Sequence, residues 1–102
     1  MVSKFTSGTS RARGISFTAQ VWKERGTYVA YAPDLDVSSC GDSLSEAKAR
    51  LRGAVELFLE EAARLGTLGE ILAEAGFEKH GKTFQPRRIL ARERVRLAVP
   101  AA

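Results

Sequence analysis

Apolar and polar residues alternate in the first third of the chain. Residues 15–21 read Ile-Ser-Phe-Thr-Ala-Gln-Val, which is the period of a half-buried strand. Its apolar face carries Ile15, Phe17, Ala19 and Val21. A short charged turn over residues 23–26 ends in glycine, and the β-branched and aromatic residues 27–32 follow it. The pattern predicts an antiparallel hairpin, and residues 37–40 are long enough for a short third strand after the turn at Pro33.

The helical part begins with Ser-Leu-Ser-Glu at residues 43–46, a capping box in which Ser43 and Glu46 each satisfy the other's backbone N–H. Apolar residues then recur at steps of three and four, at Leu44, Ala47, Leu51, Ala54, Val55, Phe58, Ala62 and Leu65. This spacing predicts an amphipathic helix of about six turns that ends at Gly66.

A second capping box, Thr67 to Glu70, predicts a shorter helix that closes at Gly76 and Phe77. Residues 78–88 are expected to form an exposed loop. A period of two returns in residues 89–99, where Val95, Leu97 and Val99 alternate with arginines, and this predicts a last strand ended by Pro100.

The element order is therefore β-β-β-α-α-β, which predicts an α+β fold of two layers. We expect a small mixed sheet with the long helix packed on one face. Residues 1–14 lack an apolar period and are expected to form a flexible basic arm, with residues 15–102 as a single domain.

The size and charge of the chain narrow the choice of function. A chain of 102 residues and 11.1 kDa makes one core, and its single Cys40 excludes a disulfide framework. No apolar run reaches the length of a membrane span and no signal peptide is present, so a cytoplasmic location is expected. The net charge of +4 is divided between basic ends, +3 in residues 1–13 and +6 in residues 79–102, and an acidic middle, −1 in residues 14–41 and −4 in residues 42–78.

Residues typical of enzyme active sites are sparse. His80 has no partner at helical metal-ligand spacing, and nothing near Cys40 in the sequence supplies a base. Residues 76–83 formally match a phosphate-binding loop, but they follow a helix end instead of a buried strand. Four acids near the third strand, Asp34, Asp36, Asp42 and Glu46, have oxygen ligands for a divalent metal, but turn, capping and helix-dipole roles account for them as well. We expect no enzyme activity, no metal and no cofactor.

Two further groups of residues are open to more than one interpretation. The row Arg92, Arg94 and Arg96 is suited to phosphates or an acidic partner, or it protects an edge strand from aggregation. Tyr28 and Tyr31 point to opposite faces of their predicted strand, so at least one of them belongs to the core, while the other, with Trp22, is a candidate interface anchor.

Two stretches of the sequence resemble the HicB family of type II antitoxins and HicB-like small proteins. The first is Gly-Thr-Tyr-Val-Ala-Tyr-Ala-Pro-Asp-Leu at residues 26–35, and the second is Cys-Gly-Asp-Ser-Leu-Ser-Glu-Ala at residues 40–47, which opens the long helix. With the helix at residues 51–59, the resemblance covers residues 15 to 65.

The resemblance implies a partial RNase H-like fold, homodimers or higher homo-oligomers, and neutralisation of a HicA-type mRNA interferase toxin. The residues expected to bind the partner are Tyr31, Asp34, Asp36 and Asp42, because acidic side chains steer a basic toxin. Many family members add a C-terminal DNA-binding module, which we do not expect in this chain. The alternatives are a nucleic-acid-binding module that uses Arg92, Arg94 and Arg96 with the N-terminal arm, a stand-alone HicB-like protein without a toxin, and, more remotely, a metal-dependent nuclease.

Overall fold

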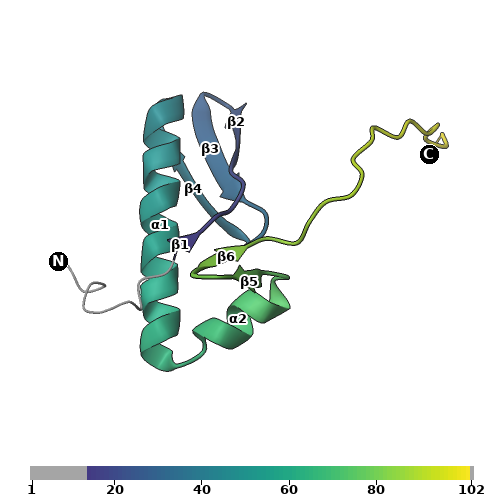
Figure 1. Cartoon of the computed structure of the whole chain (residues 1–102). Helices are drawn as coiled ribbons and strands as arrows, with labels where there is room; N and C mark the ends of the chain where they lie inside the picture. Colours follow the sequence, from purple (N-terminus) through teal and green to yellow (C-terminus); the bar gives the residue numbers. More distant parts are fainter. Residues whose placement is uncertain (1–13, 102) are drawn as a thin grey trace.

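The computed structural model describes residues 14–101, and Figure 1 shows one long helix against a small sheet. The elements are β1 (Gly14–Ile15), β2 (Gln20–Glu24), β3 (Thr27–Ala32), β4 (Val37–Gly41), α1 (Leu44–Leu65), α2 (Leu68–Glu74), β5 (Glu78–His80) and β6 (Thr83–Gln85). An antiparallel sheet has the order β2-β3-β4, and a second sheet has the order β1-β6-β5, with β1 and β6 parallel. The predicted α+β class is confirmed, with two small sheets in place of one. Of the predicted N-terminal arm, only Gly14 lies within the described residues, and it belongs to β1.

The first hairpin forms where the alternation predicts it. Arg25 and Gly26 both have positive φ, 52° and 83°, which is the geometry of a two-residue type I′ turn. The predicted first strand is interrupted, however, because residues 16–19 lie in neither sheet. The amide of Thr18 donates a hydrogen bond to Oδ2 of Asp34 at 3.3 Å, and Ala19, expected on the apolar face, is exposed. The carboxylate of Asp34 thus accepts a backbone hydrogen bond from Thr18 that the carbonyl group of a neighbouring strand would accept in a sheet.

Helix α1 begins at the predicted cap. Oγ of Ser43 accepts a hydrogen bond from the amide of Glu46 at 3.1 Å. The carboxylate of Glu46 accepts from the amide of Asp42, one residue earlier than the predicted box, at 2.6 Å. The helix ends at Gly66, whose φ of 78° is left-handed.

Helix α2 closes as expected but opens differently. The side chain of Thr67 makes no capping hydrogen bond to α2, and its hydroxyl donates to the carbonyl oxygen of Ala62 at 3.4 Å instead. At the other end, Gly76 has a φ of 91°, and the amide of Phe77 donates to the carbonyl oxygen of Leu72 at 2.9 Å. Phe77 is buried, which confirms the predicted hydrophobic contact at this helix end.

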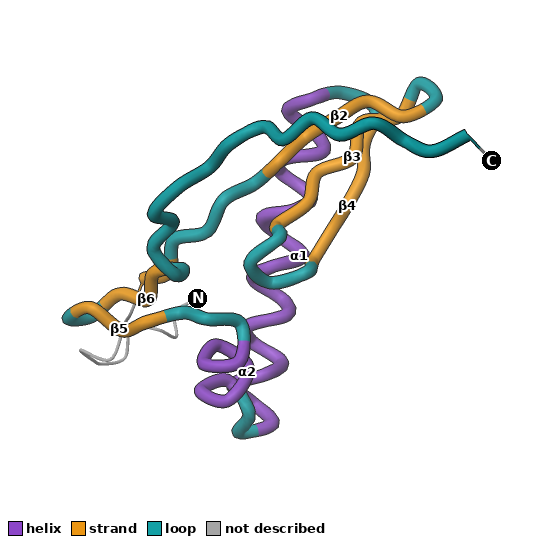
Figure 2. The backbone as a smooth tube through the Cα atoms, turned by 90° about the vertical axis from the view of Figure 1, so that its right-hand side faces the viewer, coloured by secondary structure: helices purple, strands orange, loops and turns teal. Residues whose placement is uncertain are grey.

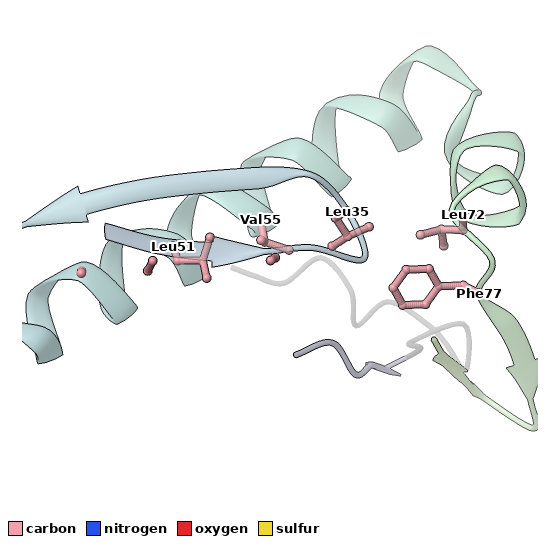
Figure 3. Packing of buried hydrophobic residues seen from close by; sticks show 8 residues of the cluster. Leu35, Leu51, Val55, Leu72 and Phe77 are labelled. Atoms are coloured by element: carbon pink, nitrogen blue, oxygen red, sulfur yellow. The ribbon is translucent and has the colours of Figure 1, made fainter. Parts of the chain in front are cut away.

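The core lies between α1 and the sheet and extends to α2. Its buried cluster contains Ala30, Ala32, Leu35, Ala47, Leu51, Val55, Leu72 and Phe77. Figure 3 shows Leu35, from the turn after β3, between Val55 of α1 and the pair Leu72 and Phe77. The alanines of β3 and α1 have small side chains, so the helix approaches the sheet closely. The apolar stripe of α1 is not buried over its whole length, because Leu44 and Leu65 at its two ends are exposed.

The C-terminal predictions are wrong in two respects. Residues 78–88, expected to be a loop, contain the β5–β6 hairpin with Gly81 at positive φ in its turn. Residues 89–99, expected to be a strand, have no secondary structure, and the whole segment 86–101 is drawn as loop in Figure 2. A strand needs a hydrogen-bonded neighbour, and β6 already occupies the position beside β1. The later segment pairs with no strand within residues 14–101.

Candidate partner-binding surface

The sheet β2-β3-β4 has one covered face and one open face. Ala30 and Ala32 of β3 are fully buried against α1, so Val29 and Tyr31 point to the opposite side. Cross-strand register then assigns the whole open face, which consists of Gln20, Trp22, Glu24, Thr27, Val29, Tyr31, Ser38 and Cys40. In Figure 1 both helices of the described chain lie away from this face.

Tyr31 lies on the central strand of the open face, near the end of β3. Its hydroxyl donates a hydrogen bond to Oδ1 of Asp36 at 2.9 Å. The ring of Trp22 lies edge-on to the Tyr31 ring, with 6.3 Å between centroids and an interplanar angle of 68°. The indole N–H of Trp22 donates to Oε1 of Glu24 at 3.3 Å. Two aromatic rings are therefore held in a fixed arrangement between two carboxylates, while 42% of Trp22 stays exposed.

Asp36 also changes the acid–base chemistry of Tyr31. The hydrogen bond to the carboxylate, with smaller contributions from desolvation and from the negative charge of Asp36, raises the pKa of Tyr31 above its ordinary value of 10.0. The neutral phenol is thus favoured, and it remains a hydrogen-bond donor across the physiological pH range. Tyr28, by contrast, packs against the core with the amino group of Lys23 5.4 Å from its ring centroid. The two tyrosines do lie on opposite faces, as predicted.

The turn at residues 33–36 fixes the positions of its two acids, because one residue of the turn is buried in the core. Leu35 is 8% exposed and belongs to the core, so the turn is anchored there. Asp36 adopts a positive φ of 58°, a conformation that Asp and Asn tolerate, and its amide donates to the carbonyl oxygen of Ala32 at 2.8 Å. Asp34 lies on the same turn but is half-buried, with its carboxylate bonded to the amide of Thr18. Asp36 is the acid that faces the aromatic pair.

Asp42 does not join this group. It follows the far end of β4, and the five residues of that strand separate it from Asp36. At about 3.3 Å per residue, the two acids lie on the order of 20 Å apart. The structure therefore brings Tyr31, Asp34 and Asp36 to one end of the sheet and leaves Asp42 at the N-terminus of α1.

Glu24 is the member of the surface that sequence reasoning missed. The signal for it lies in the turn Arg25–Gly26, because a two-residue hairpin turn fixes the register of both strands. That register pairs Trp22 with Val29 and Glu24 with Thr27, so Trp22 and Glu24 share the face of Tyr31.

The other candidate residues remain separate. Arg92, Arg94 and Arg96 are exposed on the segment that forms no strand, so no sheet aligns them into a row. His80 lies on β5 with Nε2 3.4 Å from Oε1 of Glu78, and Cys40 is exposed on the open face. Within residues 14–101 no three His, Cys, Asp or Glu side chains gather closely enough to hold a metal ion, and neither helix is long and apolar enough to cross a membrane.

Comparison with known proteins adds no relative. The chain matches no protein-family model, no curated protein and no solved structure.

Proposed function

We propose that this protein is a HicB-like antitoxin-type protein that binds and neutralises a HicA-type mRNA interferase toxin through the open face of its sheet. The observation that carries the proposal is the cluster of Trp22, Tyr31 and Asp36 on a sheet face that no described helix covers. Exposed Trp and Tyr side chains dominate the binding energy of many interfaces, and acidic neighbours attract a basic partner. A toxin that cleaves RNA has a basic active surface, and covering that surface blocks access of RNA.

The residues that carry the family resemblance have structural roles consistent with this proposal. Residues 28–30 form the centre of β3, and Pro33 with Asp34 opens the turn that presents Asp36. Residues 41–46 connect β4 to α1 through the Ser43 cap. The motif thus builds the scaffold on which the aromatic and acidic residues are displayed.

Co-expression with a neighbouring gene product of the HicA type tests the proposal. We expect the chain to rescue growth from that toxin and to co-purify with it. Asp36→Asn removes the charge while keeping a residue that tolerates positive φ, and it should weaken the complex by about tenfold or more, as should Trp22→Ala. Asp42→Asn is the matched control, because Asp42 lies at the other end of β4, and it should change affinity less than about twofold.

Two outcomes would contradict the proposal. One is the absence of a complex with any HicA-type neighbour, which favours the stand-alone interpretation. The other is equal affinity for the wild type and the variants at Asp36 and Trp22, which would place the interface elsewhere.

Nucleic-acid binding is the second candidate function. It rests on the exposed Arg92, Arg94 and Arg96, whose guanidinium groups form no ion pair within the described residues. Such binding should weaken steeply as salt rises and fall when the three arginines become alanine. Undetectable or salt-independent binding to RNA and DNA removes this candidate.

A further inference from the structure

The C-terminal segment, residues 86–101, contains a stretch with the pattern of a strand and no partner, residues 94–99, called the tail strand below. Its apolar side chains Val95, Leu97 and Val99 are 67%, 81% and 88% exposed. The segment leaves the fold and ends far from α1 (Figure 1), and the radius of gyration is 16.9 Å against roughly 13 Å for a compact chain of this length. An amphipathic strand exposed in this way is stable only when another sheet edge receives it.

The sheet β2-β3-β4 offers two edges, and only one is free to receive a strand. At the β4 edge, the guanidinium of Arg50 donates to the carbonyl oxygen of Cys40 at 3.4 Å and occupies a group that an added strand would need. At the β2 edge, the pairing of Glu24 with Thr27 turns the backbone N–H and C=O groups of Gln20, Trp22 and Glu24 toward β3. The backbone N–H and C=O groups of Val21 and Lys23 therefore point outward, with no described neighbour.

A groove lies next to the β2 edge. It lies between α1 and the residues that precede β2, Ala19 among them, and has a volume of about 510 Å³. Its apolar lining comes from Ile15, Phe17, Leu51, Val55 and Leu59, and the charged Lys48, Arg52 and Glu56 of α1 also line it. A strand added to β2 would place every second side chain toward this groove.

We propose that the tail strand of one copy adds to the β2 edge of a second copy of the chain, and that the exchange is reciprocal. Val95, Leu97 and Val99 then fill the groove beside α1. Arg94 and Arg96 fall on the opposite face, next to Trp22 and Glu24, where cation–π and ion-pair contacts are available. The alternation of the tail strand thus places its apolar side chains toward the apolar part of the groove and its arginines beside an aromatic and an acidic side chain.

A second copy is the occupant, because the tail strand is directed away from its own groove. The guanidinium of Arg87 donates to the carbonyl oxygen of Ala75 at 3.0 Å, which ties the start of the segment to the end of α2. From there the chain projects into solvent (Figure 1). Reciprocal exchange of a terminal strand closes a two-fold dimer and leaves neither tail strand exposed.

Sedimentation equilibrium of the full chain tests the dimer without any toxin, so its result is independent of the proposed function. We expect a mass of twice the 11.1 kDa chain for the wild type. Leu97→Asp should raise the dimer dissociation constant by about tenfold or more, because it places a charge in the groove. Leu90→Asp is the matched control, since Leu90 is 86% exposed on the same segment but outside the tail strand, and the dimer should persist.

A peptide of residues 88–101, titrated into the Leu97→Asp protein and followed by amide NMR, locates the binding site. We expect shifts at Val21, Lys23 and Phe17, and none with a peptide that carries Leu97→Asp. A monomeric wild type, a Leu97→Asp protein that remains dimeric, or peptide shifts confined to other residues would each overturn the proposal. Pairing of two tail strands with each other would appear as a dimer in which the peptide leaves the β2 amides unchanged.

Discussion

Gly41 lies where α1 meets the sheet, and its replacement by alanine is the sharpest stability test that the fold offers. Gly41 is buried at the end of β4. A Cβ built at this position would lie 2.8 Å from the backbone nitrogen of Ala47 and 2.9 Å from Cγ of Glu46. These atoms belong to the first turn of α1, so the Gly-Asp-Ser sequence at residues 41–43 has a steric reason for its glycine.

The expected change in the free energy of unfolding on Gly41→Ala is the sum of stabilising and destabilising contributions. Replacing glycine by alanine restricts the unfolded chain and stabilises by about 0.4–1 kcal/mol where the backbone allows it. Overpacking a tight contact costs about 1–3 kcal/mol, and moving the first turn also disturbs the Ser43 cap, worth about 0.5–2 kcal/mol. Because the nearest atom is helix backbone and not the end of a flexible side chain, we expect a net loss of about 2 kcal/mol.

Gly53→Ala is the matched control, because Gly53 lies within α1 and a Cβ there has nothing within 4 Å. That substitution should stabilise the protein by about 0.5–1 kcal/mol. Urea unfolding measures the free energy of unfolding of both variants, which are compared on condition that the dependence of that free energy on urea concentration has the same slope. If Gly41→Ala is as stable as the wild type or more so, α1 does not rest on β4 as described.

Two further predictions concern the open face and the core. In a Tyr28→Phe background, where Tyr31 is the remaining tyrosine, Asp36→Asn should lower the pKa of Tyr31 toward 10.0, as measured by phenolate absorbance. Because the folded-state pKa is raised, the stabilisation from this hydrogen bond is complete below the unfolded pKa and is lost as pH rises through the folded pKa, so the two proteins should converge in stability at alkaline pH. In the core, Leu51→Ala should cost about 2–5 kcal/mol, whereas Leu57→Ala, at a position that is 66% exposed, should change stability by less than about 0.5 kcal/mol in the same urea assay.

Local signals in the sequence account for most of the first two thirds of the fold. The Arg25–Gly26 turn, the Ser43 cap and the Gly66 end are each decided by residues a few positions apart, and each is confirmed. The interruption at residues 16–19 was not predictable in this way, because it depends on the carboxylate of Asp34, sixteen residues away from Thr18. The cap predicted at Thr67 failed because its hydroxyl bonds back to the preceding helix.

The candidate site, like the fold, was predictable from the sequence only where neighbouring residues decide the structure. Strand alternation alone separates Tyr28 from Tyr31, and the two-residue turn at Arg25–Gly26 places Glu24 on the face of Tyr31. The sequence cannot show that Asp42 lies at the opposite end of β4 from Asp36, because that separation depends on strand length, which the folded sheet sets.

The sequence by itself determined the α+β class, the two helices and the hairpin, because these depend on side-chain period and on capping residues close together in the chain. Only the tertiary structure decided the fate of residues 89–99. Their alternation is that of a strand, but a strand exists only when another backbone receives its hydrogen bonds, and β6 holds the position beside β1.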